Sequence, residues 1–342
     1  MKKDLLLLIS ALILVNISLA NNNKSKLLEL ISSNHDTTYI ERIDNTLGLK
    51  LFYINKYSSL QIGSRNFDED ISYQANSNHS TGLGVIYGVF DINFGYSRKN
   101  TKRGDSKKID FQTQMYLPTS TLRLSITRFK GFYIDNAEKL INNWQTGNYY
   151  IRDDIEATTI NATANYFFNH QRYSNKVLFA HQALQKRTAG SFLAGIAFGY
   201  NGVRGDSSFI PERIIDTAAF NISITNVNYY SLGGNIGYAF NIVIRKHWFI
   251  GGLIAPGISY AYNKQSSNEG ENTENTMNFY LQTEFGIGYN SNRFFIGANR
   301  CQTSARAPIG HEHNSLELRN GKTNVMFVYR FKLKNVFNFL SN

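Results

Sequence analysis

The sequence predicts an all-β fold, an antiparallel transmembrane β-barrel of about 12 to 14 strands. Three long runs between Tyr229 and Tyr289 alternate apolar and polar residues with a period of two, which is the side-chain period of a β-strand. The apolar faces of these runs are rich in aromatic residues. The chain of 342 residues also has a mean hydropathy of −0.32, far below that of a helical membrane protein, whereas barrels are near neutral because half of each strand faces a polar lumen.

Each of the three runs has one apolar face and one polar or small face. The apolar faces comprise Tyr230, Leu232, Ile236, Tyr238 and Phe240, then Trp248, Ile250, Ile254, Ile258, Tyr260 and Tyr262, and then Met277, Phe279, Leu281, Phe285, Ile287 and Tyr289. A soluble β-sandwich would have the same period. The membrane is favoured because Cys301 is the only cysteine, so no disulfide can form within the chain, and because aromatic girdles and polar lumen faces are typical of membrane barrels.

The first 20 residues have the features of an export signal. Lys2 and Lys3 precede an apolar core, and Ala20 ends a small-residue cleavage site. We therefore predict a cleaved signal peptide at residues 1–20, a periplasmic lead-in at 21–45, the barrel at 46–332 and a C-terminal tail at 333–342. The run that ends at Phe331 resembles the aromatic last strand of outer-membrane barrels, so the predicted location is the outer membrane of a Gram-negative bacterium.

The other strands are expected from the same alternation. In chain order they are residues 47–53, 60–62, 83–96 (a hairpin or one bent strand), 109–115, 122–126, 160–168, 177–184, 192–200, 294–298 and 325–331. A turn is expected at Asn55 and Lys56, and polar loops are expected at 65–80, 130–154, 201–226 and 303–320. Long loops of a barrel usually lie on its extracellular face. No internal repeat or linker divides the chain, which indicates one domain.

Four charged residues fall on faces that should point into the lumen: Lys50, Arg123, Glu284 and Arg330. In a channel these side chains would meet the solute. Barrels of about eight strands are filled by side chains and those of 16–18 hold a channel, so the predicted size lies between the two. The four charges could equally pair across the lumen and stabilise the barrel, because buried charges are usually paired. We favour a porin-like channel or transport protein, or a structural surface barrel.

A membrane-embedded lipid hydrolase is the alternative. His313 and Ser315 would share a face if their segment were a strand, and Glu312 or Glu317 could orient the imidazole. The segment is an expected polar loop without an oxyanion-hole motif, so the pair is a weak signal. His311 and His313 make an incomplete metal site. The sequence therefore predicts no catalytic residue, no enzyme activity, no metal and no cofactor.

The long loops suggest a third role, the recognition of a molecule outside the cell. The loop at 130–154 contains Tyr133, Trp144, Tyr149 and Tyr150, which could stack on a sugar. Packing of these rings against the barrel mouth is favoured, because amphipathic aromatic residues often lie at the membrane interface.

The formal net charge is +11 at pH 7, but the Lys and Arg residues are spread through turns and loops and form no motif. A nucleic-acid partner is therefore not expected. The expected partners are outer-membrane lipid and lipopolysaccharide, the outer-membrane insertion machinery and small solutes.

Several short phrases follow one another along the chain: Tyr39-Ile40-Glu41, Phe129-Lys130-Gly131-Phe132-Tyr133, Tyr149-Tyr150-Ile151-Arg152, Ala189-Gly190-Ser191-Phe192-Leu193, Ile210-Pro211, Lys246-His247-Trp248-Phe249, Gly288-Tyr289-Asn290-Ser291 and Arg293-Phe294-Phe295-Ile296-Gly297. In this order they resemble a bacterial family known as domain of unknown function 4421, from about Thr38 to Phe331. The resemblance implies an outer-membrane β-barrel. It implies no catalytic or ligand residues, because none is assigned in that family.

Overall fold

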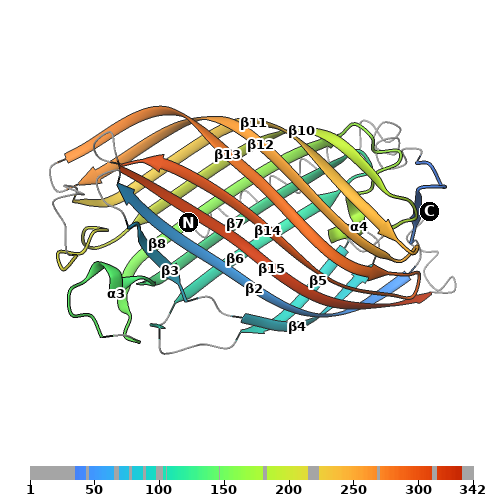
Figure 1. Ribbon diagram of the computed structural model, residues 1–342, viewed down its shortest axis with the longest axis horizontal. Coiled ribbons are helices and arrows are strands. Elements are labelled where there is room, and N and C mark those ends of the chain that lie inside the picture. The colour runs from blue at the N-terminus through green and yellow to red at the C-terminus, as the bar shows by residue number, and fades with distance from the viewer. Residues whose placement is uncertain are drawn as a thin grey trace, which may run out of the picture.

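The computed structural model describes residues 35–43, 46–64, 69–76, 79–87, 90–97, 103–104, 106–145, 147–179, 183–214, 223–267, 270–309 and 314–332. Thirteen antiparallel strands form one sheet that curls into a barrel (Figure 1). The predicted fold class is therefore confirmed. The predicted signal peptide and C-terminal tail lie outside the described residues. In the described part of the chain, no helix is long and apolar enough to cross a membrane.

The elements follow the chain in a simple order. They are β1 (Ile40–Arg42), β2 (Thr46–Ser64), β3 (Ile71–Ala75), β4 (His79–Tyr87), β5 (Phe90–Ser97), β6 (Lys107–Tyr116), β7 (Ser120–Ile134), α3 (Ala137–Leu140), β8 (Tyr150–Phe167), α4 (Lys176–Phe179), β9 (Ala183–Gln185), β10 (Ala189–Arg204), β11 (Ile224–Ile244), β12 (Trp248–Ser267), β13 (Gly270–Asn290), β14 (Phe294–Pro308) and β15 (Asn314–Lys332). All of them except β1, β9 and the two helices belong to the barrel sheet.

The barrel closes because β15 pairs with β2 over their full length, from Lys332 opposite Thr46 to Asn314 opposite Ser64. The closed ring has ten strands: β2, β3, β7, β8 and β10 to β15. The short β3 joins the extracellular parts of β2 and β7. Below it, β4 and β5 extend from β2 and β6 extends from β7, and no pairing joins the described residues of β5 and β6.

The outer face of the barrel is the apolar face that the sequence indicates. On β12, for example, the exposed side chains run from Trp248 through Ile254 to Tyr262. This stretch spans roughly 35 Å along the membrane normal for a strand tilted by about 40°, enough for an apolar band of about 25 Å with an aromatic girdle at each edge. In the upper girdle the Tyr230 ring lies 4.9 Å from that of Tyr200 and 6.3 Å from that of Tyr262. The barrel wall therefore suits a lipid bilayer.

One sector of the outer wall departs from this pattern. On β14 the apolar outward residues end after Ala298, and the next outward positions are Arg300, Gln302, Ser304 and Arg306. The sector continues onto β2 and β15. Tyr57 donates to Gln302 Oε1 at 2.9 Å and accepts from Arg300 at 3.1 Å, and Arg319 pairs with Glu317 at 2.7 Å. We call this sector, made of the outward residues of β14, β15 and β2 above Ala298, the polar wall.

The two ends of the barrel differ. At the α4 end, the connections at 117–119, 245–247 and 291–293 are tight turns. At the α3 end lie the long connections at 135–149 and 205–223 (Figure 1). Because outer-membrane barrels have short periplasmic turns and longer extracellular loops, we assign the α4 end to the periplasm and the α3 end to the outside.

Four predicted local features are wrong. The turn at Asn55 and Lys56 is absent, because β2 continues through both residues and Lys56 pairs with Lys322. The loop at 303–320 is largely strand, since its polar residues lie on the polar wall and in the lumen. The expected strand at 177–184 is instead helix α4 followed by β9, and the expected loop at 65–80 contains β3.

The polar wall can be distinguished from the lipid-facing wall by placing one charge on each. We expect Ile254→Arg to lower the free energy of unfolding by about 2–4 kcal/mol, because Ile254 lies near the middle of the apolar band. Ser304→Arg, the control on the polar wall, should cost only about 0–1 kcal/mol. Urea unfolding in lipid vesicles, followed by tryptophan fluorescence, measures both. Equal losses would contradict the assignment of the polar wall.

Candidate lumen site

An ion pair crosses the middle of the lumen. Arg123 on β7 and Glu284 on β13 come from opposite walls of the ring, and Arg123 Nη1 lies 2.5 Å from Glu284 Oε1. Gln282 Nε2 donates to the same carboxylate at 2.9 Å, and Asn165 Nδ2 donates to Gln282 Oε1 at 3.3 Å. The Glu284 side chain is only 3% exposed. Because a buried carboxylate needs such partners, the network fixes the distance between the two walls.

Two further cations face the same space. Lys56 on β2 and Lys322 on β15 are register partners on the lumen side, and both line a cavity together with Arg123 and Cys301. Like charges directly opposite one another on a sheet repel. Glu284 is the one carboxylate among the described residues that line this cavity and its two neighbours. The centre of the lumen is therefore net positive.

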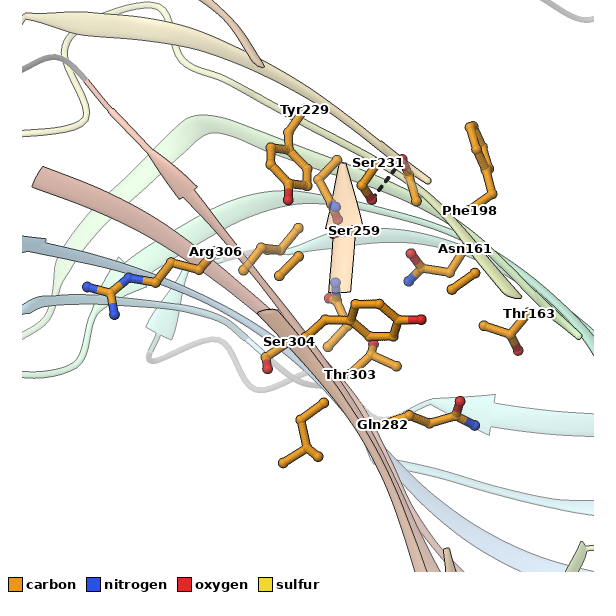
Figure 2. A pocket seen from close by; sticks show the side chains of 18 of the residues that line it. Asn161, Thr163, Phe198, Tyr229, Ser231, Ser259, Gln282, Thr303, Ser304 and Arg306 are labelled. Carbon is orange, nitrogen blue, oxygen red and sulfur yellow. Dashed lines mark hydrogen bonds between the residues drawn. The ribbon is translucent and has the colours of Figure 1, made fainter. Parts of the chain in front are cut away.

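Three cavities follow one another through the barrel. The outermost contains about 690 Å³ of empty space, part of it open to the outside, and is lined by hydroxyl and amide groups that include Asn161, Tyr229, Ser231 and Ser259 (Figure 2). The cationic cavity beside it contains about 750 Å³ and shares Asn161 and four other lining residues with it. A third cavity of about 290 Å³ shares Arg123 with the cationic one and reaches the periplasmic end. The three cavities adjoin one another inside the barrel, and the third has room for about one water molecule.

A small module closes the periplasmic mouth. We call residues 36–42, 170–179 and 183–187, which contain β1, α4 and β9, the periplasmic plug. Strand β1 pairs with β9, and Ile40, Val177 and Ala183 pack against inward residues of the barrel wall: Phe52, Ile86, Phe249, Phe295, Met326 and Val328. The plug is tied to the wall by hydrogen bonds from Asn241 Nδ2 to the Ser174 carbonyl (2.8 Å) and from Asn290 Nδ2 to the Ala183 carbonyl (3.0 Å). The plug is thus held by apolar packing and by side-chain hydrogen bonds, and it shares no strand pairing with the barrel sheet.

The plug surface that faces the periplasm is held by short-range contacts. The Tyr39 ring centre lies 5.1 Å from the guanidinium carbon of Arg172 and 5.8 Å from that of Arg187. The Thr38 hydroxyl and backbone amide donate to the Asp36 carboxylate, and this lowers the pKa of Asp36, with Arg172 and Arg187 acting in the same direction. Asp36 is therefore ionised at neutral pH, and its carboxylate holds Thr38 in the segment that leads into β1.

Loops close the extracellular mouth. Arg152 binds both carboxylate oxygens of Asp154 at 2.7 Å and donates to the carbonyls of Ser207 and Ser208, and Tyr73 donates to the Phe209 carbonyl at 2.7 Å. These bonds hold the loop after β10 over the opening. Apolar side chains of the cap then pack on inward residues of the strands: Leu140, Ile141, Phe209, Ile210 and Ile214 on Leu60, Ile62, Phe129, Leu316 and Leu318. No open channel runs along the axis through the part of the barrel that is described.

The structure brings together two of the four predicted lumen residues. Arg123 and Glu284 form the central ion pair. Lys50 and Arg330 lie apart from them near the periplasmic mouth, where Lys50 Nζ is 5.8 Å from the Phe52 ring centre and Arg330 donates to the Ser291 carbonyl and to Asn290 Oδ1. Their role in solute passage stays a prediction.

The other predicted groups are placed only in part. His311, Glu312 and His313 lie outside the described residues. Ser315 lies on β15, where its hydroxyl accepts from Arg306 at 2.9 Å, and Glu317 is paired with Arg319. In the extracellular loop, the Arg103 guanidinium lies over the rings of Tyr133 (5.4 Å) and Tyr149 (5.1 Å), and Trp144 and Tyr150 pack on the apolar cap. These rings serve packing, as the sequence favoured.

Sequence reasoning missed Lys56 and Lys322. Lys56 falls in the expected turn, and Lys322 falls between the expected loop at 303–320 and the expected strand at 325–331, although Lys56 has the same parity as Lys50. A strand extended through Asn55 would have placed both lysines of β2 on one face. The alternation of inward and outward residues does continue through this segment, but the polar pair Asn55-Lys56 has the composition of a turn.

The ion pair can be tested by removing one partner and then both. We expect Arg123→Met to lower the free energy of unfolding by about 3–5 kcal/mol, because Glu284 is left buried without its cation. Adding Glu284→Leu should restore most of that loss, since two apolar groups leave no buried charge. Urea titration of the refolded barrel in vesicles gives both values. Equal stability of the single and double variants would show that the pair does not fix the walls.

None of the curated proteins that were compared matches this chain. Solved structures similar to it include the outer membrane protease OmpT from Escherichia coli (9% identity, TM-score 0.37, covering 85% of this chain and 98% of that one) and the outer membrane protein OprG from Pseudomonas aeruginosa (10% identity, TM-score 0.23, covering 87% and 100%). Ail, the attachment invasion locus protein of Yersinia pestis, is also similar (13% identity, TM-score 0.24, covering 83% and 99%). At these identities and TM-scores nothing about activity follows.

The family comparison is of a different kind, because it covers nearly the whole barrel. A family model described as a domain of unknown function, DUF4421, matches residues 34–331. This is the family that the ordered phrases in the sequence resemble, and that prediction is confirmed. The chain belongs to the DUF4421 family.

Proposed function

We propose that this protein is an outer-membrane transport barrel that admits small anionic solutes to its lumen and releases them by displacement of the periplasmic plug. The observation that carries this proposal is the chain of three polar cavities whose charged lining is net positive. Lys56, Lys322 and Arg123 face one carboxylate, Glu284. An anion placed between the two register-paired lysines would relieve their mutual repulsion.

Displacement of the plug, and not an open pore, fits the way the lumen is closed. Apolar packing closes the extracellular end, and the plug closes the periplasmic end through a small apolar cluster and single hydrogen bonds. Elements that move in function come from the weakly held parts of a structure. The plug meets that condition better than the barrel strands, which are paired along their length.

The setting of this function is the outer membrane of a Gram-negative bacterium, reached through a signal peptide cleaved from residues 1–20. Outer-membrane lipid, lipopolysaccharide and the insertion machinery are the expected partners there. A purely structural barrel is the next candidate, since the ion pair and the two caps also stabilise a closed wall. A lipid hydrolase has less support, because Ser315 is held by Arg306 on the polar wall.

Conductance in planar bilayers tests the transport role. We expect the full chain to be closed most of the time, and Asn241→Ala with Asn290→Ala to open it more often, because these side chains tie the plug to the wall. The open steps should prefer chloride to potassium. Lys56→Gln with Lys322→Gln in the same background should reduce that preference.

The control variant for the loosened plug is Asn272→Ala, a change of the same type at an exposed position of β13. It should behave as the unmodified protein. Silent bilayers with verified insertion of the loosened variant, or steps without anion preference, would contradict the transport proposal.

A further inference from the structure

The barrel wall splits on one side. Strands β13 and β14 are paired from Asn290 opposite Phe295 up to Leu281 opposite Ser304, and the pairing ends there. Beyond that point, toward the extracellular end, β13 continues from Tyr280 to Gly270 and pairs only with β12. Among the described residues no strand covers this edge of β13.

The split arises because the end of β14 turns into the barrel. Asn263 and Gln265, on the inner face of β12, both donate to the Pro308 carbonyl, at 2.6 and 2.9 Å. Ala307 packs against Tyr229 on the inner face of β11 and against Ala261 on the inner face of β12. The described end of β14 at Pro308 therefore lies behind β12, and no described strand other than β12 pairs with residues 270–280 of β13.

The part of this edge from residue 276 to residue 280 lies within the lipid-facing band, whereas residues 270–275 lie at or above the upper aromatic girdle, where Asn275 pairs with Tyr262. Outward residues on it, Met277 and Phe279, are 63% and 82% exposed, and their register partners Tyr260 and Ile258 lie below the upper aromatic girdle. Unpaired backbone groups in hydrocarbon cost several kcal/mol each, so an open sheet edge is not stable against bare acyl chains. The edge therefore requires a polar environment or a polar occupant.

The surroundings of the split supply that polar environment. The polar wall begins directly across it, with Ser304 and Arg306 on β14 and Arg300 below them. The outermost lumen cavity reaches the split as well, since its lining includes residues 279–282 of β13 and 303–306 of β14 (Figure 2). Tyr280 can lie flat on the neighbouring strand because Gly257 has no side chain, where a Cβ would be 2.4 Å from the Tyr280 ring. The outermost cavity therefore adjoins the split from the lumen side.

We propose that this split is a lateral entrance through which an anionic single-chain amphiphile, such as a long-chain carboxylate, passes from the outer leaflet into the lumen. The acyl chain would lie along Met277, Phe279 and Leu281. The carboxylate would enter past Arg306 and the hydroxyl and amide groups of the outer cavity toward Lys56 and Lys322. This inference rests on the proposed transport of anions and specifies both the solute class and the route.

A neutral chain or a water-soluble anion fits these observations less well. A neutral amphiphile would not need the cationic cavity, and a soluble anion would not need an entrance from the lipid. Pairing of the free β13 edge with the same edge of a second copy of the chain would also satisfy its backbone groups. That arrangement would cover the entrance, and it is an outcome of the test.

The experiment measures binding of radiolabelled dodecanoate to the full chain in proteoliposomes. We expect saturable binding, weaker by about tenfold or more for dodecanol, because the alcohol forms no charge-assisted bond to the lysines. Ser304→Trp, which places a large ring at the mouth of the split, should abolish dodecanoate binding. The matched control is Ala298→Trp, on the same strand and the same outward face but below the split, and it should bind as the unmodified protein does.

The outcomes separate the route from the function. Unchanged dodecanoate binding by Ser304→Trp, with chloride conductance of the loosened plug variant intact, would overturn the lateral entrance alone. Absence of anion conductance in the loosened plug variant, together with absence of dodecanoate binding by the unmodified chain, would overturn the transport proposal. Equal binding of dodecanol and dodecanoate would overturn the anionic solute class. A stable dimer cross-linked through Asn275→Cys in a Cys301→Ser background would show that a second copy covers the edge, and would overturn the entrance.

Discussion

The constraint on which this structure depends is that every backbone N–H and C=O group inside a bilayer must be hydrogen-bonded within the protein. The chain meets it by pairing β15 with β2 along 19 residues, so that its last strand closes on its first long one. Closure in turn fixes the alternation, because each strand then has one face toward lipid and one toward a confined interior. The exposed Trp248 and Phe279 and the buried Glu284 are consequences of the same geometry.

The confined interior explains why polar residues there act in networks. A charge inside a narrow barrel is removed from bulk water and needs a partner, and Glu284 obtains one from the opposite wall because the lumen is narrow enough for Arg123 to cross it. Among the described residues that line the cavities, cations outnumber carboxylates around this pair. The ion pair of Arg123 and Glu284 stabilises the wall, and the cationic excess beside it suits an anionic solute.

The sequence predicted the parts of the fold on which lipid acts most strongly. The outward faces of β11 to β13 were predicted correctly, because a tall apolar band imposes alternation on each of the three runs between Tyr230 and Tyr289. The sequence-based prediction failed where lipid does not impose this alternation. The polar wall made residues 303–320 read as a loop, and Asn55-Lys56 read as a turn inside a continuous strand. The plug was missed for a different reason: Val177 is buried by long-range contact with the barrel mouth, which no local period reports. Of the candidate site, the ion pair's residues were found, but their meeting across the lumen depends on register and ring size.

The closed ends of the barrel and the split in its side both favour entry of a solute from the side. An apolar cap closes the extracellular end of the barrel and the plug closes the periplasmic end. A solute in the water above the barrel therefore has no direct route along the axis to the polar interior. Besides the edges of β5 and β6, which no described pairing joins, the sheet is broken where β14 turns inward and leaves the edge of β13 without a described partner at residues 276–280 of the apolar band. A break of this kind is costly in lipid, and it coincides with the polar wall, with the outermost cavity and with the start of a path toward the cationic centre. The coincidence of these features at one position is what distinguishes an entrance from a defect in the sheet.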